Sequence, residues 1–380
     1  MTKLGAKLLT ATIKNPQKRN FIYNMLMDYS FANTAIKQNA SIEWLINCVH
    51  NYLSKPKLVV VWLVGGLGNQ MYFYAFGKAL ESMGYSVIFD AGVGGYAQNW
   101  RGGGNPKNKS KTPTNIRNLE ITNFNLTLPI DLDFDKELFF DLVDKDRANL
   151  PQSERIKMPY KYLITNFDAH ALDNIHTGAY FSNGYWFSLA YFKHLDSTIR
   201  TEFSLKTPLS HTNANLKARI LDTKDSVFLH IRRGDYLQYS EHYTNLCEGK
   251  YYEGAIRLIK SKLTKPHIFI FSNDMAWCER EFLNILSDSC KEGVEFEFVA
   301  NNGEDSAVQE MELMRSCQNA IIANSTFSWW AGYLIDNPHK IVVRPNRETK
   351  DSAPVTYDDS PAYNDIVLVD SHTGEIKIRD

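Results

Sequence analysis

Short apolar runs alternate with amphipathic stretches through the second half of the chain. From about residue 214 onward the apolar runs have the length of strands, and the intervening stretches carry apolar residues at helical spacing. This alternation is typical of a parallel sheet with helices on both faces. The predicted strands are Ser226–Ile231, His267–Ser272, Val294–Ala300, Asn319–Ala323 and Ile341–Arg344, and the predicted helices are Tyr251–Leu263, Met275–Leu286, Ser306–Arg315 and Trp329–Ile335.

A similar pattern opens the region that follows residue 57. Leu58–Val64 is a continuous apolar run that predicts a buried strand, and it leads through a glycine-rich loop into a predicted helix, Met71–Met83. A second short strand is predicted over Tyr85–Asp90. Strand, glycine loop and helix in this order are typical of the start of a doubly wound α/β domain.

Residues 1–57 differ from the rest, because they hold one amphipathic stretch and no strand pattern. Apolar residues from Ile42 to Leu53 fall on one helical face, with Ser41 as the N-cap candidate. We expect a helix packed on the main body, or alternatively a helix that contacts a membrane surface or a second copy of the chain. The predicted organisation is a helical appendage at 1–57, α/β domains at 58–205 and 206–350, and a tail at 351–380.

Composition narrows the classes of partner. The 42 basic and 43 acidic side chains nearly cancel, so bulk charge gives no support to a nucleic-acid partner. The five cysteines form no Cys-x-x-Cys pair, which argues against a disulfide framework and a cysteine zinc site. No apolar run approaches the ~20 residues of a membrane span, and no signal-peptide block is present, so we expect a cytoplasmic protein.

Two adjacent arginines follow the predicted strand Ser226–Ile231. Arg232 and Arg233 stand at its carboxyl end, where open α/β sheets bind their ligands. Guanidinium groups match phosphate oxygens with paired hydrogen bonds, and His230 and Asp235 flank the pair. The pattern predicts a phosphate-binding turn, and the alternative is a salt-bridged turn at the surface.

Two further predicted strands also end in polar residues that open a helix. Helix N-termini attract phosphate groups, although such residues often serve only as helix caps. Three strand ends of one sheet with polar groups on the same side predict a nucleotide site more strongly than any one of them. The residues concerned are Ser272, Asn273 and Asp274 after the first strand, and Asn324, Ser325, Thr326 and Phe327 after the second.

The glycine-rich loop Gly65–Gln70 partly matches a dinucleotide-binding fingerprint. Met71 stands where the third glycine of that fingerprint would be, so the match to an NAD-dependent oxidoreductase is incomplete. We expect this loop to bring its backbone close to a ligand. The loop residues expected to line a cleft are Gly66, Gly68, Asn69 and Gln70.

Alternating carboxylates give the chain one candidate metal site. Asp131, Asp133 and Asp135 could hold a divalent cation against phosphates. They lie far along the chain from the strand-end motifs, and Arg232 and Arg233 already supply positive charge. We therefore expect no metal requirement.

Four motifs follow one another between about residues 58 and 345. They are Gly65–Met71 (GGLGNQM), His230–Tyr236 (HIRRGDY), Phe271–Asp274 (FSND) and Asn324–Trp330 (NSTFSWW). In this order and spacing the chain resembles the α-1,2-fucosyltransferases of glycosyltransferase family 11.

The resemblance implies a GT-B-like fold, with two Rossmann-like doubly wound domains facing a cleft. It implies transfer of L-fucose from GDP-fucose to the 2-hydroxyl of a terminal β-galactoside, with inversion and without a metal or other cofactor. Residues 58–205 would then be the acceptor side and 206–350 the GDP-fucose-binding domain. By the same resemblance Arg232 and Arg233 bind the diphosphate, and the polar residues of the other two strand ends lie near the guanosine diphosphate.

A transferase of this kind also benefits from a carboxylate that takes the proton of the acceptor hydroxyl. Asp235 is the first candidate, because it follows the arginines directly, and Glu241 is the second. Asp235 could instead orient the arginines, and the sequence leaves these two roles open. Fucose transfer with another linkage or acceptor, and a non-catalytic nucleotide-binding module, remain the alternatives.

Overall fold

The structure is a computed structural model that describes residues 58–91, 119–134, 139, 161–162, 179–181, 187–300, 302–303, 306–347, 349–350 and 366–377. The described residues divide into two compact units. The first contains 58–64, 73–91 and the described residues between 127 and 187, and the second contains 65–72, 119–126 and those from 188 onward. The predicted appendage at residues 1–57 lies outside the described residues.

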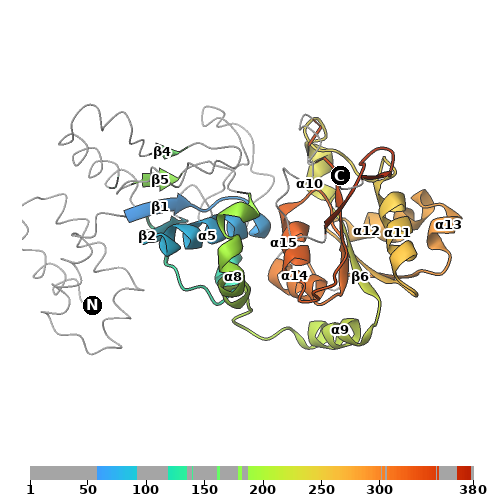
Figure 1. Ribbon diagram of the computed structural model, residues 1–380, viewed down its shortest axis with the longest axis horizontal. Helices are drawn as coiled ribbons and strands as arrows, with labels where there is room; N and C mark the ends of the chain where they lie inside the picture. The colour runs from blue at the N-terminus through green and yellow to red at the C-terminus, as the bar shows by residue number, and fades with distance from the viewer. Residues whose placement is uncertain are drawn as a thin grey trace, which may run out of the picture. The chain divides into compact units, whose positions relative to one another are not determined.

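A five-stranded parallel sheet forms the centre of the first unit (Figure 1). The strands lie side by side in the order β3-β2-β1-β5-β4. The chain places β2 and β3 on one side of β1, and then β4 and β5 on the other side. Phe76 of α5 packs its ring 5.1 Å from that of Phe181, which places this helix against the sheet. The strands are β1 Leu58–Trp62, β2 Ser86–Asp90, β3 Ile130–Asp131, β4 Lys161–Tyr162 and β5 Ala179–Phe181, and α5 is Leu67–Ser82.

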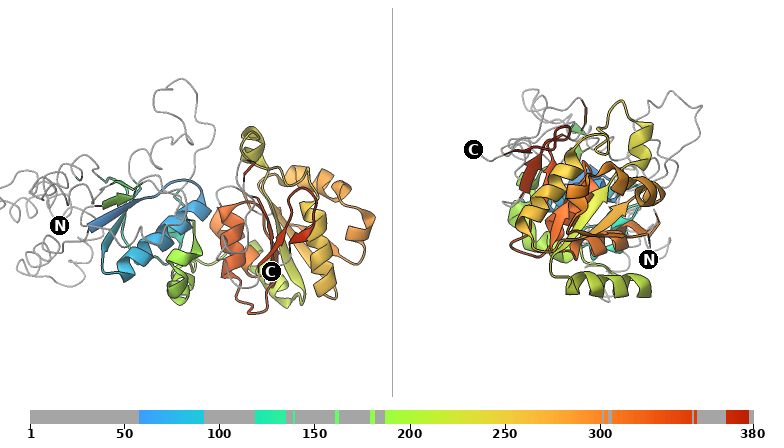
Figure 2. Two further views of the ribbon diagram at one scale, coloured as in Figure 1. Left: turned by 45° about the horizontal axis from the view of Figure 1, so that its top comes forward. Right: turned by 90° about the vertical axis from the view of Figure 1, so that its right-hand side faces the viewer.

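The second unit is built on a seven-stranded sheet in the order β12-β11-β10-β9-β6-β7-β8, parallel except for β12 (Figures 1 and 2). Its strands are β6 Ser226–Ile231, β7 His267–Ser272, β8 Glu295–Phe298, β9 Asn319–Ile321, β10 Val342–Pro345, β11 Ile366–Val369 and β12 Ile376–Lys377. Its helices are α8 Asp196–Glu202, α9 His211–Asp222, α10 Gly234–Gln238, α11 Tyr251–Lys262, α12 Met275–Glu281, α13 Asp288–Lys291, α14 Ala307–Arg315 and α15 Thr326–Leu334, with short 3-10 turns at Ile121–Asn123, Leu189–Tyr191, Lys193–Leu195 and Phe282–Ile285.

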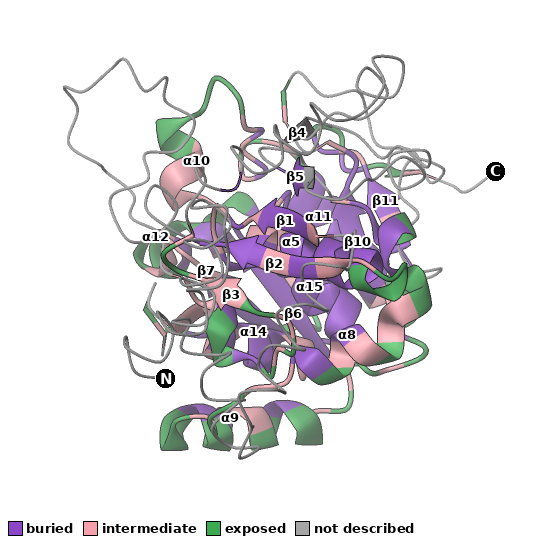
Figure 3. Ribbon diagram, turned by 90° about the vertical axis from the view of Figure 1, so that its left-hand side faces the viewer, coloured by how far each residue is buried: buried purple, intermediate pink, exposed green. Residues whose placement is uncertain are grey.

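Strand β6 is buried along its whole length (Figure 3). Its side chains alternate between two helical layers. Leu229 and Ile231 pack in one core cluster with Tyr252 of α11. His230 points to the other face, where its ring lies 5.6 Å from that of Phe327 in α15. Because side chains alternate along a strand, the residues that follow β6 are set to approach both layers.

The two predicted doubly wound α/β units are confirmed, and most predicted strands agree with the structure to within two residues at each end. Two helices begin earlier than the sequence pattern predicts, α5 at Leu67 and α15 at Thr326. The segment expected to be a tail contains β11, parallel to β10, and β12, antiparallel to β11. The pattern missed these strands because each is short and their partners lie earlier in the chain.

Candidate functional site

The second sheet has a topological switch point between its neighbouring strands β6 and β9. From β6 the chain adds β7 and β8 on one side, and then returns to place β9 on the other. Open α/β sheets bind ligands in the crevice outside the carboxyl ends of strands at such a point. Residues 232–234 and 322–325 follow these two strands, so the predicted arginine motif and one polar motif meet at this place.

Arg232 is held by the carboxylate that follows it in the chain. Its Nη2 donates to Oδ2 of Asp235 over 2.7 Å, and both side chains are largely buried. The centre of the guanidinium group lies 5.8 Å from the centre of the Tyr236 ring. Asp235 is therefore placed to orient Arg232.

Arg233 is held by the opposite helical layer. Its Nε donates to Oδ2 of Asp274 over 3.2 Å, and its backbone N–H donates to Oδ1 of Asn273 over 3.0 Å. The guanidinium carbon lies 3.8 Å from the centre of the Trp277 ring in α12, a close cation–π contact. The two neighbouring arginines are thus fixed by different elements on either side of the sheet edge.

The Asn273 side chain at the end of β7 fills the space beside Gly234. A Cβ at this position would lie closer than 3.0 Å to Nδ2 of Asn273. The same amide nitrogen lies 3.5 Å from Oδ1 of Asp235. Ser272 completes this strand end by accepting a hydrogen bond from the backbone N–H of Asp274 over 3.0 Å. The second predicted motif therefore packs directly on the arginine motif.

The third predicted motif joins the same cluster. The Tyr236 hydroxyl donates to the backbone carbonyl of Asn324 over 2.8 Å. Ser325 is the N-cap residue of α15, and its side chain makes no capping hydrogen bond. Uncapped N–H groups at the first turn of a helix attract anions. The structure thus brings together the three strand-end motifs that the sequence singles out.

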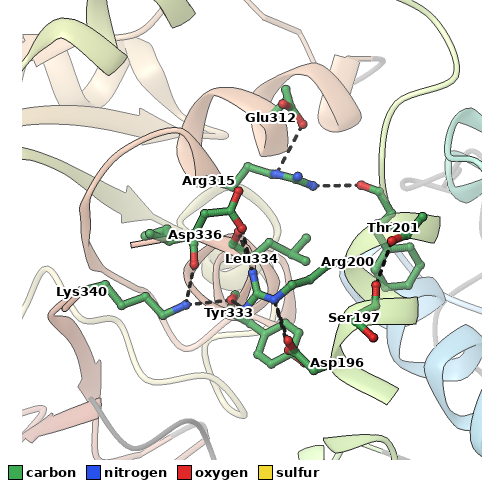
Figure 4. A network of polar contacts seen from close by, with 12 residues as sticks. Asp196, Ser197, Arg200, Thr201, Glu312, Arg315, Tyr333, Leu334, Asp336 and Lys340 are labelled. Carbon is green, nitrogen blue, oxygen red and sulfur yellow. Dashed lines mark hydrogen bonds and ion pairs between the residues drawn. The ribbon is translucent and has the colours of Figure 1, made fainter. Parts of the chain in front are cut away.

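The opposite end of α15 is covered by two cations (Figure 4). Lys340 Nζ donates to the carbonyl oxygens of Tyr333 and Ile335, each over 2.8 Å. Arg200 of α8 donates to the carbonyl oxygens of Tyr333 and Leu334, over 2.8 and 3.1 Å. These contacts satisfy the last carbonyls and compensate the negative end of the helix dipole, while the positive end faces the switch point.

The predicted loop conformation of Gly65–Gln70 is wrong from Leu67 onward, because the residues from there on form the first turns of α5. That these residues line a cleft stays a prediction. A Cβ on Gly68 would lie closer than 3.0 Å to the backbone nitrogen of Phe327, so the N-termini of α5 and α15 meet at this glycine. Asn69 accepts a hydrogen bond from the Thr326 hydroxyl over 2.7 Å.

Gly66 is the part of the expected cleft loop that precedes the helix, and a Cβ there would have no atom within 4 Å. Gln70 has no exposed surface. Its side chain donates to the carbonyl of Gly65 and accepts from the backbone N–H of Ile121, each over 3.0 Å. Both the nitrogen and the oxygen of the Gln70 amide are hydrogen-bonded, and they link the start of α5 to Gly65 and to the turn at Ile121.

His230 is a buried imidazole beside Arg232. Burial, together with the positive charge of Arg232, lowers its pKa to about 3, and the negative charge of Asp235 opposes this shift only in part. The ring is therefore neutral near pH 7. Its Nδ1 is shielded from solvent and has no hydrogen-bond partner in the described part of the chain.

Sequence reasoning missed Glu310 of α14. Its pKa is raised to about 7, mainly by burial; the charge of Arg232 opposes the rise, and the charge of Glu120 adds to it. The signal available in the sequence is its position one helical turn before the buried Met314, which puts an acid on the apolar side of a helix. Acids in such places often have functional roles.

Glu241 follows α10 in the chain. Its side chain is 63% exposed and lies 3.9 Å from the His242 ring. Its assignment as a base stays a prediction.

The described aspartates of the candidate metal site form a local turn. Oδ1 of Asp131 accepts from the backbone N–H of Asp133 over 2.9 Å, while Asp135 lies outside the described residues. Within the described ranges, no group of three or more histidine, cysteine, aspartate or glutamate side chains is arranged to hold a metal ion. The described helices also include none with the length and apolar character needed to cross a membrane.

An NAD-dependent oxidoreductase would need an acid that binds the ribose of the cofactor, and in the sequence Asp90 is the only acid near the expected position. This carboxylate is fully buried at the end of β2 and accepts a hydrogen bond from the Tyr180 hydroxyl. Its hydrogen bond to Tyr180 is thus made inside the core of the first unit, away from solvent and from any ribose.

Comparison with known proteins decides between these alternatives at the level of the family. Residues 145–358 match the sequence model of glycosyl transferase family 11. The chain belongs to this family. It is 29% identical to an alpha-1,2-colitosyltransferase of Escherichia coli over 76% of this chain and 91% of that one. It is 25% identical to the galactoside alpha-(1,2)-fucosyltransferase 2 of Bos taurus over 74% of this chain and 70% of that one.

Among solved structures, a FUT1 mutant of Arabidopsis thaliana in complex with GDP is similar over 88% of this chain and 80% of that chain, with 12% identity and a TM-score of 0.41. We take no functional conclusion from a similarity at this level. The family membership establishes that the chain is a glycosyltransferase, as the resemblance carried by the four motifs implies.

Proposed function

We propose that this glycosyltransferase moves L-fucose from GDP-fucose to the 2-hydroxyl of a terminal β-galactoside, with inversion at the anomeric carbon. The observation that carries the proposal is the arginine pair at the switch point of the second sheet, with each guanidinium group fixed by its own carboxylate. The names of the two curated relatives support an α-1,2 linkage.

Arg232 and Arg233 would hold the diphosphate of the donor. Negative charge grows on the β-phosphate as the sugar leaves, and two preorganised guanidinium groups stabilise that charge without rearrangement. The uncapped first turn of α15 would add backbone N–H groups at the same place. These contacts replace the charge that a metal ion would otherwise bring, and we therefore propose that the reaction needs none.

The donor sugar has one specific alternative, because one relative is named a colitosyltransferase. Colitose lacks the 3-hydroxyl group that fucose carries. A site that hydrogen-bonds this hydroxyl would reject colitose strongly, whereas a site that leaves the position open would accept both sugars.

The experiment is incubation of the purified protein with lactose and either GDP-fucose or GDP-colitose, followed by NMR of any trisaccharide. We expect a product whose anomeric signal identifies an α-linkage to the 2-position of galactose. A product linked at another position would contradict the linkage, and no product with lactose or other β-galactosides would contradict the acceptor. Release of GDP without any glycoside product would indicate that the protein only hydrolyses the donor.

A further inference from the structure

The two carboxylates nearest to Arg232 and Arg233 in the hydrogen-bond network already pair with these arginines. Asp235 binds Arg232 through Oδ2, and Asp274 binds Arg233. A carboxylate in an ion pair of this kind is a weak base, because the neighbouring cation stabilises its charged form. The group that takes the proton of an acceptor hydroxyl is therefore better sought elsewhere around the site.

Glu310 is a carboxyl group of a different kind. It stands on α14, on the helical layer that covers the same face of the sheet as His230 and α15. It is partly buried, and in the described part of the chain its side chain makes no hydrogen bond or ion pair. The charged groups that act on it come from two other segments, Arg232 after β6 and Glu120 before the turn at Ile121.

We propose that Glu310 is the general base of this glycosyltransferase, the group that accepts the proton of the acceptor hydroxyl. The proposal rests on the proposed function. Its geometric basis is a partly buried carboxylate that is unengaged in the described part of the chain and stands in the first turn of α14. This helix follows β8, which runs parallel to β7 and β6, so it begins at the edge of the sheet where β6 ends and where Arg232 would hold the departing diphosphate.

The reaction balances with this assignment. The acceptor oxygen forms a bond to the anomeric carbon as the bond from that carbon to the β-phosphate oxygen breaks. The electron pair of the broken bond stays on the diphosphate, beside the two arginines, and the acceptor proton moves to the Glu310 carboxylate. Release of that proton to water restores the base.

The surroundings of Glu310 suit a base that operates near neutral pH. Burial and the charge of Glu120 hold its pKa at about 7, well above that of an ordinary glutamate. A diphosphate bound to Arg232 would offset the positive charge that lowers this pKa. Donor binding would therefore make Glu310 a stronger base, in the complex where the proton must be taken.

The test compares the wild-type protein with E310Q, and with E312Q as the matched control. Glu312 lies on the same helix, but its carboxylate is engaged by Lys217 at 2.6 Å and by Arg315 at 3.5 Å. Each protein is assayed for transfer from GDP-fucose to lactose between pH 5.5 and 8.5, and GDP affinity is measured by calorimetry.

We expect E310Q to bind GDP within about threefold of wild type and to lose roughly 10²–10⁴-fold in kcat. Wild type should lose rate tenfold for each pH unit well below about pH 7, and E310Q should lack this dependence. E312Q should keep both the rate and the pH dependence.

An E310Q variant that transfers at the wild-type rate, or that keeps the acidic limb of the pH profile, would overturn the proposal. Loss of GDP affinity in parallel with rate would also overturn it, because it would make Glu310 a positioning residue for Arg232. If the wild-type protein transfers no sugar, the proposed function itself fails, which is a different result from an active E310Q.

Discussion

The α-carbon of Gly68 touches the backbone at Phe327 so closely that a methyl group cannot fit between them, since a Cβ would lie closer than 3.0 Å to that nitrogen. The two residues are far apart in the chain, yet they bring together the first turns of α5 and α15. This contact explains why a glycine stands in the first turn of the helix, where the sequence alone suggested a loop whose backbone comes close to a ligand.

The first prediction follows from this contact. Gly68→Ala should lower the free energy of unfolding by about 1–3 kcal/mol, because overpacking against backbone cannot be relieved by a side-chain movement. Urea denaturation measures the change. Gly66→Ala is the control, because a Cβ there meets no atom within 4 Å, and it should be neutral or slightly stabilising. Equal stability of the two variants would contradict the contact.

The second prediction concerns the arginine pair. Arg232→Lys and Arg233→Lys should each lower turnover by about 10²–10³-fold with the fold retained, because lysine cannot form paired hydrogen bonds to phosphate. Arg233→Lys should also weaken GDP binding, since it loses the flat contact with Trp277. Arg219→Lys serves as the control, at a 60% exposed arginine paired with Glu297. Near wild-type transfer by both variants would remove the arginines from the donor site.

The third prediction separates the two roles considered for Asp235. The hydrogen bond to Arg232 favours the orienting role. Asp235→Asn should therefore weaken GDP affinity and lower turnover together. Calorimetry with GDP, alongside the transfer rate, distinguishes the outcomes. A variant with unchanged GDP affinity and a rate lowered by about 10²–10⁴-fold would instead make Asp235 the base, and would count against Glu310.

The fourth prediction concerns metal ions. Transfer should persist in excess EDTA, because guanidinium groups supply the positive charge at the diphosphate. The measurement is the initial rate with and without chelator, followed by addition of Mg²⁺ or Mn²⁺. Loss of activity that either ion restores would show a metal requirement, and would renew interest in Asp131 and Asp133.

The fifth prediction uses the pKa of Glu310. In the folded protein Glu310 keeps its proton up to about pH 7, whereas the unfolded chain releases it near pH 4.5. The folded state thus binds more protons between these values, so this group makes stability fall as pH rises from about 5 to 7. His230 acts in the opposite sense, because its folded pKa of about 3 lies below the ordinary 6.5 and stability is lost as pH falls below 6.5.

The difference in the free energy of unfolding between wild type and E310Q isolates the contribution of Glu310 from that of His230. In urea titrations at pH 5, 6, 7 and 8, the advantage of E310Q over wild type should grow as pH rises. A constant difference across this range would show that the folded and unfolded states have the same Glu310 pKa.

Much of the second unit could be predicted from the sequence. The run Ser226–Ile231 is apolar throughout, so both the strand and the place of the arginines at its end could be predicted, and the structure agrees. Trp277 was visible in the sequence, but its position over Arg233 depends on how α12 packs beside β7. That packing is tertiary, and no local pattern specifies it.

Glu310 was missed for a related reason. The helix Ser306–Arg315 was predicted, yet the charges that act on Glu310 come from Glu120 and Arg232, both far away in the chain. Gly68 was noticed, but a glycine that lets the backbone approach a ligand looks the same in sequence as one that lets two helices approach each other, as Gly68 does.

The late position of β11 has a consequence for synthesis of the chain. While the ribosome is still adding the residues that follow β10, strand β10 can pair with β9 on one side only, and its other edge remains open. Open edges are where nascent chains associate with one another. Once Ile366–Val369 has emerged, the newborn protein can close this edge with its own residues, and the hairpin to β12 then shields the new border. A stop codon shortly after Pro345 would thus yield a chain prone to self-association.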